Sequence, residues 1–209
     1  MSLGGKLVSL FPLLQILGIA ACAYALPQSA LVRLGGILFF LYAFPLIAFR
    51  LHNWFFPLRR SLSEISAKQY IPWWGAYSIQ SLFMAMPWLE SWMKTIPGLY
   101  SFWLRLWGSR VGKGIFWAPT SRVEDRSLLD IGDNVVVGYD SCFVAHLVKR
   151  DPAGELKLFV SPIKVGSGAL IGALCRIGPG TQIVENSQVP ANTVTYRGAR
   201  HTCLPEEMQ

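Results

Sequence analysis

The stretch VGSGALIGALCRIG, residues 165–178, carries an aliphatic residue followed by glycine at every sixth position. The same step recurs in three runs of the chain, and a mostly small residue stands four positions after many of these anchors. The anchors are Val111, Trp117, Val123, Ile131, Val137, Phe143, Val165, Ile171, Ile177, Ile183 and Val189. The positions four residues later hold Val135, Ser141, Ala169, Cys175, Thr181, Ser187 and Thr193. A six-residue period of this kind predicts a parallel β-helix.

In such a helix each six-residue unit forms one short face, and three faces close a triangular coil. The anchor and the small residue point inward, and the glycine relieves backbone crowding at the corner. We therefore predict a mainly β fold, with a parallel β-helix of about four coils over residues 110–200 and a C-terminal tail over residues 201–209.

Composition divides the chain into two parts. Of its 209 residues, 52% are hydrophobic and only 15% are charged, and the apolar residues are concentrated before residue 110. The chain as a whole is too apolar for an ordinary soluble domain. The net charge is +7, but many cations stand beside apolar segments, where attraction to anionic lipid headgroups is the simpler explanation. We expect membrane lipids as partners and no nucleic acid.

Two apolar runs predict transmembrane helices. Leu7–Leu26 has no charged residue and Leu31–Phe49 has one, and each run is long enough to cross the hydrocarbon core. A signal peptide is the alternative for the first run, but that run is long for one and the second follows at once. The connector, residues 27–30, has no Lys or Arg. The outer ends are flanked by Lys6, Arg50, Arg59 and Arg60. The positive-inside rule then predicts a multi-pass protein of the inner (cytoplasmic) membrane, with both ends and the β-helix in the cytoplasm.

Tryptophan and proline alternate between the second apolar run and the β-helix. Residues 70–107 hold six tryptophans and three prolines, which is too broken a pattern for a third span. Tryptophan rings favour the membrane–water boundary, so we predict short interfacial helices here. Core helices packed against the base of the β-helix are the alternative. Residues 1–109 as a whole are predicted to be a membrane anchor.

The four cysteines form no C-x-x-C pair. They are Cys22, Cys142, Cys175 and Cys203. This spacing argues against a disulfide framework and against a zinc site, so we predict no metal. Reduced cysteines also fit a cytoplasmic location.

The six-residue step breaks once, between Phe143 and Val165, which are 22 residues apart. The excursion from about Leu147 to Pro162 predicts a loop extruded from the β-helix, a usual place for a binding function in a solenoid. His146 stands directly before this loop, three residues after an anchor, where a side chain points outward. We therefore predict that His146 is functional; an ordinary surface histidine is the alternative.

The order of these features resembles that of the hexapeptide-repeat acyltransferases, above all the galactoside and maltose acetyltransferases. The resemblance is carried by IGDNV at residues 131–135 through His146, by PIKVG at residues 162–166 and by VPANTV at residues 189–194. The segment WLRLWGSRVGKG at residues 103–114, which follows a membrane region, also resembles the C-terminal region of polylysine-synthetase-like proteins. The resemblance covers about residues 103–200.

The resemblance implies a left-handed β-helix that assembles as a homotrimer, with a thioester donor in the groove between subunits. It also implies that His146 is the general base, a role that suits an imidazole because its pKa lies near working pH. Glu124 falls near an acidic position of the family, and Asp125 is equally placed to assist. The alternative for both acids is a solvated corner of the β-helix.

The resemblance further implies where the donor binds. Gly172 and Ala173 fall where backbone N–H groups would stabilise the oxyanion, and Lys164 also falls among the donor contacts. The donor is expected to be acyl-CoA or an acyl carrier protein, with no permanently bound cofactor.

The chain also departs from this family. Phe116 and Trp117 occupy the area of an asparagine that often helps to bind sugar hydroxyls, and Leu170 replaces a family tryptophan. The β-helix is about one coil short after Gln182, in the part that carries many coenzyme A contacts. These departures argue against a sugar acceptor and favour a donor held by its acyl chain and pantetheine arm, such as an acyl carrier protein.

The sequence thus predicts a membrane-anchored O- or N-acyltransferase. It would move an acyl group from a thioester to a hydroxyl or amine of a lipid-like or lipid-linked acceptor. A carbonic anhydrase would need three histidines at one metal, and only His146 lies in the β-helix. A non-catalytic, membrane-bound trimeric scaffold is the remaining alternative.

Overall fold

The structure is a computed structural model that describes residues 2–24, 29–65, 69–195 and 200–201, the last pair by backbone alone. The chain forms two compact units. The first comprises residues 1–58 and 65–85, and the second comprises residues 59–64 and 86–209.

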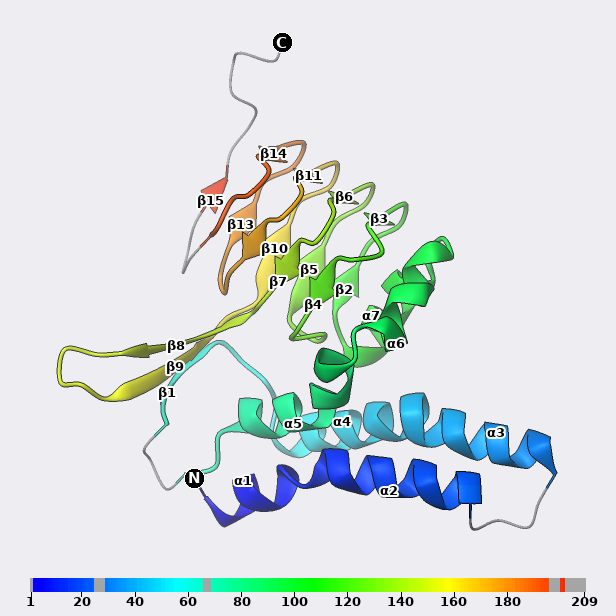
Figure 1. Cartoon of the computed structure of the whole chain (residues 1–209). Coiled ribbons are helices and arrows are strands. Elements are labelled where there is room, and N and C mark those ends of the chain that lie inside the picture. Colours follow the sequence, from blue (N-terminus) through cyan, green and yellow to red (C-terminus); the bar gives the residue numbers. More distant parts are fainter. Residues whose placement is uncertain (1, 25–28, 66–68, 196–199, 202–209) are drawn as a thin grey trace. The chain divides into compact units, whose positions relative to one another are not determined.

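The first unit is helical (Figure 1). Its helices are α1 (Leu3–Val8), α2 (Phe11–Tyr24), α3 (Ala30–Leu38), a π-helical turn (Phe39–Ala43), α4 (Phe44–Phe55) and α5 (Pro72–Ala85). The stretches Leu3–Tyr24 and Ala30–Phe55 are each long and apolar enough to cross a membrane. They contain the predicted spans except for Ala25 and Leu26, which lie outside the described residues.

A proline inside the second apolar stretch explains an unusual buried glutamine. Pro45 has no N–H, so it cannot donate to the carbonyl of Leu41 one turn earlier. The side-chain amide of Gln15, which is fully buried, donates to that carbonyl at 3.3 Å. The two apolar stretches therefore share a polar contact where the helical pattern is interrupted.

The second unit contains a parallel β-helix with three faces (Figure 1). The first face holds β2 (Arg110–Val111), β5 (Leu129–Ile131), β10 (Ile163–Val165), β13 (Gln182–Ile183) and β15 (Arg200–His201). The second face holds β3 (Phe116–Trp117), β6 (Val136–Val137), β11 (Leu170–Ile171) and β14 (Gln188–Val189). The third face holds β4 (Arg122–Val123), β7 (Cys142–Phe143) and β12 (Arg176–Ile177).

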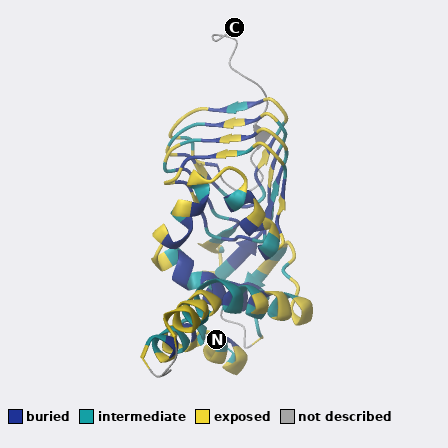
Figure 2. Ribbon diagram, turned by 90° about the vertical axis from the view of Figure 1, so that its right-hand side faces the viewer, coloured by how far each residue is buried: buried dark blue, intermediate teal, exposed yellow. Residues whose placement is uncertain are grey.

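The six-residue period predicted from the sequence is confirmed by burial. Every anchor is 7% exposed or less, and the small residues from Val135 to Ser187 are buried as well. Figure 2 shows buried and exposed residues following one another along each coil, and in most of the two-residue strands the first residue is exposed and the second, the anchor, is buried. Gly168 occupies one corner at φ 70°, in the left-handed region that glycine adopts without strain, and a Cβ there would require the Asn186 side chain to move. The left hand of the coil stays a prediction.

The predicted loop is an antiparallel β-hairpin. Its strands are β8 (His146–Arg150) and β9 (Leu156–Val160). A third strand, β1 (Ser61–Glu64), pairs antiparallel with β9 and was not predicted. Lys157 on β9 lies 3.5 Å from the Glu64 carboxylate, which ties the added strand to the hairpin by charge as well as by backbone pairing.

Helices of the second unit close the base of the β-helix. They are α6 (Trp88–Ser91), a 3₁₀ turn (Trp92–Thr95) and α7 (Leu99–Trp107). Helix α7 ends at Gly108, whose φ of 108° suits only glycine. The indole N–H of the inward-pointing Trp117 donates to Ser101 on α7 at 3.0 Å, so α7 packs against the interior of the first coil.

The tryptophans of residues 70–107 differ in exposure, and the interfacial helices expected over these residues stay a prediction. Trp73, Trp103 and Trp107 are buried, whereas Trp88 and Trp92 remain 67% and 47% exposed. Helix α7 contacts the first coil through Ser101 and Trp117, and its Trp103 and Trp107 are buried. Residues 86–109 fall in the same compact unit as the β-helix, whereas the sequence placed the edge of the anchor at residue 109.

Candidate active site

Stacking of successive coils brings Asp125 and His146 to one corner of the β-helix. On the third face, β4 lies parallel to β7. The N–H of Glu124 donates to the Phe143 carbonyl at 3.0 Å and carries the pairing into the corner. Asp125 on one coil therefore lies beside Ala145 and His146 on the next.

A single carboxylate oxygen of Asp125 orients the imidazole. Asp125 Oδ2 accepts a hydrogen bond from the N–H of Ala145 at 2.8 Å and lies 2.8 Å from Nδ1 of His146. An ionised carboxylate only accepts hydrogen bonds, so Nδ1 carries the proton and Nε2 of the neutral ring keeps its lone pair. The histidine side chain is 15% exposed. Its Nε2 is therefore prepared to accept a proton, which is what a general base requires.

Glu124 lies on the other side of the ring. Its Oε2 is 3.9 Å from Nε2 of His146, and its side chain is 37% exposed. Glu124 thus borders the space from which a substrate proton would reach Nε2. The structure brings both predicted acids to His146, with Asp125 at Nδ1 and Glu124 on the side of Nε2.

These neighbours shift the titration of the histidine. Burial lowers the pKa of His146, whereas the hydrogen bond and charge of Asp125 and the charge of Glu124 raise it. The two carboxylates outweigh burial, and the pKa lies above its ordinary value. The ring is therefore neutral, and able to act as a base, only above that raised pKa.

The three residues expected at the donor do not share this corner within one chain. Gly172 and Ala173 follow β11, at the corner between the second and third faces, whereas His146 follows β7, between the third and first faces. Lys164 lies on β10 of the first face and is exposed.

The two expected oxyanion donors differ in the structure. The N–H of Gly172 donates to the Val189 carbonyl at 2.9 Å, so it is already used within the β-helix. No such bond is found for the N–H of Ala173 among the residues described. Ala173 is therefore the better placed of the two to donate to an oxyanion.

A buried ion pair behind the acids was not foreseen from the sequence. Arg126 Nη2 lies 2.5 Å from Glu90 Oε2, and their side chains are 1% and 5% exposed. The indole N–H of Trp103 also donates to Glu90, at 2.5 Å, and Arg126 donates to the carbonyl of Glu124 at 3.2 Å. The pair thus fixes the backbone that carries the acids to a helix outside the β-helix. Its only sequence signal was an arginine directly after two acidic residues.

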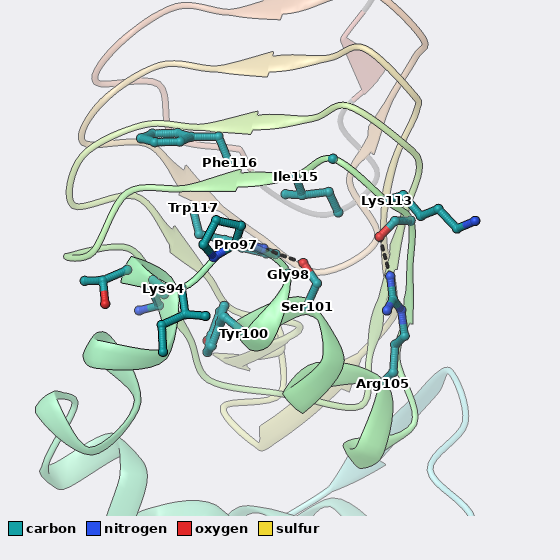
Figure 3. Close-up of a pocket in the computed structure, with 14 residues that line it drawn as sticks. Lys94, Pro97, Gly98, Tyr100, Ser101, Arg105, Lys113, Ile115, Phe116 and Trp117 are labelled. Atoms are coloured by element: carbon teal, nitrogen blue, oxygen red, sulfur yellow. Dashed lines mark hydrogen bonds between the residues drawn. The ribbon is translucent and has the colours of Figure 1, made fainter.

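Phe116 and Trp117, which were considered near the acceptor, line a different pocket of about 520 Å³ (Figure 3). This pocket lies between residues 94–105 and the first coil. Burial lowers the pKa of its Lys94 to about 8, and Lys94 donates to the carbonyls of Pro119 and Ser121. Phe116 and Trp117 lie on the second face, whereas His146 lies at the corner between the third and first faces. Within one coil the two positions therefore do not border each other.

No group of three or more His, Cys, Asp or Glu side chains is placed to hold a metal ion in the described part of the chain. Three cysteines, Cys22, Cys142 and Cys175, are free and buried there, and Cys203 lies outside the described residues. Burial raises the pKa of Cys142 to about 11, so this thiol remains protonated and unreactive beside Glu124.

No family model matches the chain, and no curated protein matches it. Solved structures do resemble it in part. A hexapeptide-repeat containing acetyltransferase from Vibrio cholerae, complexed with acetyl coenzyme A, is 25% identical over 44% of this chain and 52% of its own, with a TM-score of 0.38. This chain therefore spans about half the length of that protein.

Two further structures are similar at lower identity. Another structure of the Vibrio cholerae acetyltransferase is 19% identical over 57% of this chain and 84% of its own, with a TM-score of 0.39. A maltose O-acetyltransferase from Clostridium difficile 630 is 17% identical over 53% of this chain and 73% of its own, with a TM-score of 0.35.

Proposed function

We propose that this protein is a membrane-anchored acyltransferase that uses His146 as general base. The single observation that carries the proposal is the Asp125–His146 pair at 2.8 Å, which leaves Nε2 unprotonated at the root of the β8–β9 hairpin. A carboxylate that holds Nδ1 satisfies the ring N–H of any largely buried histidine, and at the hairpin root it also sets the tautomer in which Nε2 is the basic nitrogen. A base that must accept a proton gains both orientation and charge stabilisation.

The chemistry follows from this geometry. Nε2 of His146 accepts the proton of an acceptor hydroxyl or amine while the oxygen or nitrogen attacks the thioester carbonyl. Asp125 holds the ring and stabilises the imidazolium that forms, and Glu124 lies where it contacts the acceptor. As the tetrahedral intermediate collapses, the C–S bond breaks and the thiolate leaves with a proton returned by the imidazolium.

The donor is a thioester of coenzyme A or of an acyl carrier protein, and no permanently bound cofactor is needed for this reaction. The resemblance stated above implies Gly172, Ala173 and Lys164 at the donor. Only Ala173 combines that position with a backbone N–H that has no partner among the described residues.

We also propose a homotrimer with its active sites at subunit boundaries. One chain alone holds the base and the donor residues at different corners of the β-helix, and a neighbouring chain would supply the missing corner. The mass of the purified complex, corrected for bound detergent, should correspond to three chains, and a fully active monomer would contradict the shared site.

The membrane anchor rests on the two apolar helical stretches. Many of their large side chains are exposed, for example Leu7 at 61%, Leu13 at 54% and Leu31 at 80%. So much contiguous apolar surface is unfavourable in water and favourable in lipid. An acceptor that also partitions into lipid would then share one surface with the enzyme.

Acyl transfer to lipid is the direct test of this function. The purified full chain in detergent should transfer radiolabel from an acyl-CoA or an acyl carrier protein into extracted membrane lipids. Chromatography of the lipids measures the product. If no donor of any chain length labels any lipid, the chain is the non-catalytic scaffold and the proposed activity is wrong.

The topology has its own test. The Lys- and Arg-free connector predicts that residues 27–30 face away from the cytoplasm. In intact cells, a Ser29→Cys variant should therefore react with a membrane-impermeant thiol reagent, while Cys203 should react only after the cells are opened. The unmodified chain supplies the background from its own cysteines. Labelling of Cys203 in intact cells, with Ser29→Cys protected, would reverse the topology.

A further inference from the structure

A basic pocket of about 460 Å³ adjoins the β8–β9 hairpin. Its lining combines three parts of the second unit that are far apart in sequence. Arg60 precedes β1, Phe159 and Ser161 belong to or follow β9, and Lys164 and Gln182 lie on the first face of the β-helix. The residue before the added strand β1 is therefore part of this pocket, while the strand itself extends the hairpin sheet.

The basic pocket begins next to the proposed general base. The N–H of Ser161 donates to the carbonyl of Ala145, the residue before His146, at 2.9 Å. In the hairpin, Val160 pairs directly with His146. A group bound against Ser161 is thus held beside the chain segment that carries the catalytic imidazole.

The lining offers hydrogen-bond donors and positive charge. Neither Arg60 nor Lys164 has a carboxylate partner among the described residues. The guanidinium carbon of Arg60 lies 5.9 Å from the centroid of the Phe159 ring, which gives it a preferred direction. Asp130 is beside Lys164 in the sheet, but it does not line the pocket and lies 4.0 Å from Arg110.

Ser161 supplies a neutral donor between these cations. The residue is only 4% exposed, and no hydrogen bond from its hydroxyl to protein is found in the part of the chain that the structure describes. The hydroxyl oxygen is not among the described side-chain atoms that are fully buried without a partner, so it reaches the pocket that the residue lines and can donate to a ligand there. Guanidinium, ammonium and hydroxyl donors around one space are the set that recognises a phosphate group.

We propose that the basic pocket binds the phosphate group in the headgroup of the lipid acceptor. This inference rests on the proposed acyl transfer and adds a chemical class to its acceptor, a phosphate-bearing amphiphile whose hydroxyl or amine lies near His146. The phosphate anchors the headgroup, and the hairpin root holds the reacting group against Nε2.

Chain length favours a lipid as the source of the phosphate. Arg60 follows the end of α4, Phe55, by five residues. Five residues span at most about 18 Å even when fully extended. If α4 crosses the bilayer as proposed, Arg60 remains within reach of the headgroup region. The competing source is a phosphate of the donor, which is what the resemblance implied for Lys164.

A binding measurement on the full chain in uncharged detergent tests the pocket without catalysis. The probes are dihexanoyl phosphatidate and dihexanoylglycerol, which differ only in the phosphate, and equilibrium dialysis gives both affinities. The phosphatidate should bind more tightly. Arg60→Gln and Lys164→Gln should each weaken the binding of dihexanoyl phosphatidate by about tenfold, the scale of one charge-assisted hydrogen bond. Neither variant should change the affinity for dihexanoylglycerol.

Arg59→Gln is the matched control, because Arg59 is an exposed neighbouring cation that does not line the pocket. Its affinity for phosphatidate should equal that of the unmodified chain. An equal loss in Arg59→Gln and Arg60→Gln, or no preference for phosphatidate in the unmodified chain, would refute the pocket.

A second comparison separates acceptor from donor. The KM of Arg60→Gln should change by the same factor for acyl-CoA and for acyl-pantetheine, which lacks the nucleotide phosphates. A rise for acyl-CoA alone would assign the pocket to the donor and overturn the inference. Failure of the proposed acyl transfer would give a different result. The unmodified chain would then use no thioester donor, whatever affinity for phosphatidate the binding measurement gives.

Discussion

Replacing His146 with Ala is expected to lower turnover by roughly 10²-fold or more, the scale of a general-base contribution. The reason is local: Asp125 accepts the Nδ1 hydrogen at 2.8 Å, so Nε2 of the neutral ring carries the lone pair that accepts a proton. The measurement is the initial rate of acyl transfer by the purified variant, with its mass in detergent as proof of an intact assembly. Retention of most of the activity would remove His146 from the mechanism.

Lys149→Ala is the matched control for this variant. Lys149 lies on the same strand, β8, and is exposed. Its truncation shortens a side chain of the same strand and leaves the Asp125–His146 pair untouched. The control should keep nearly full activity. If both variants lose activity equally, the hairpin matters for structure and the histidine has no separate role.

The pH profile identifies the base as His146. Burial lowers the pKa of His146, but Asp125 and Glu124 raise it further, so the pKa lies above the ordinary histidine value. Activity should therefore fall as the pH drops through this raised pKa. Asp125→Asn removes the main stabiliser of the imidazolium. Its acid limb should therefore move to lower pH while its maximal rate drops. An unchanged acid limb in Asp125→Asn would mean that another group titrates.

The largest expected loss of stability comes from the buried pair of Glu90 and Arg126. Arg126→Met leaves the Glu90 carboxylate, 5% exposed, without its counter-charge. Breaking a buried pair by removing one partner costs about 3 to 5 kcal/mol. We expect a clear fall in the thermal unfolding midpoint in detergent, followed by tryptophan fluorescence. Glu90→Gln should be similarly destabilising, because it leaves the guanidinium alone.

Arg122→Met provides the comparison for this prediction. Arg122 makes the same kind of contact, 3.1 Å to Asp140, but both side chains are about 40% exposed. An exposed pair contributes at most about 1 kcal/mol. The double variant of Glu90→Gln and Arg126→Met should lose less stability than the two single variants lose together, because it leaves neither charge unpaired. Equal midpoints for Arg122→Met and Arg126→Met would show that the buried pair has no special weight.

Periodicity made the β-helix predictable, because a strand of two residues on each face leaves one inward anchor every six positions. The place of His146 beside the loop could also be predicted, because a break in the six-residue pattern can be read directly from the sequence. The convergence of Asp125 and His146 could only be suspected. It depends on the stacking of two coils whose corners lie 21 residues apart along the chain.

Contacts between a regular element and an irregular one escaped prediction. Trp103 and Trp107 have the amphipathic chemistry of interface residues, and only tertiary packing shows that they are buried beneath the first coil. Glu90 carries no periodic signal, and its partner Arg126 is 36 residues away. The four residues Ser61–Glu64 are too short and too polar to stand out as a strand until β9 offers them an edge.

The pairing of β1 with β9 also orders events during synthesis. Ser61 emerges from the ribosome about 100 residues before its partner Val160. Strand β1 therefore stays unpaired, after the apolar helices have been synthesised, until the hairpin has formed and the edge of β9 is available. Such a distant closure is slow compared with the coil-by-coil growth of the β-helix. A shortened chain that starts at residue 86 would keep every coil and still leave β9, with Leu158 and Phe159, as an uncovered edge that invites aggregation.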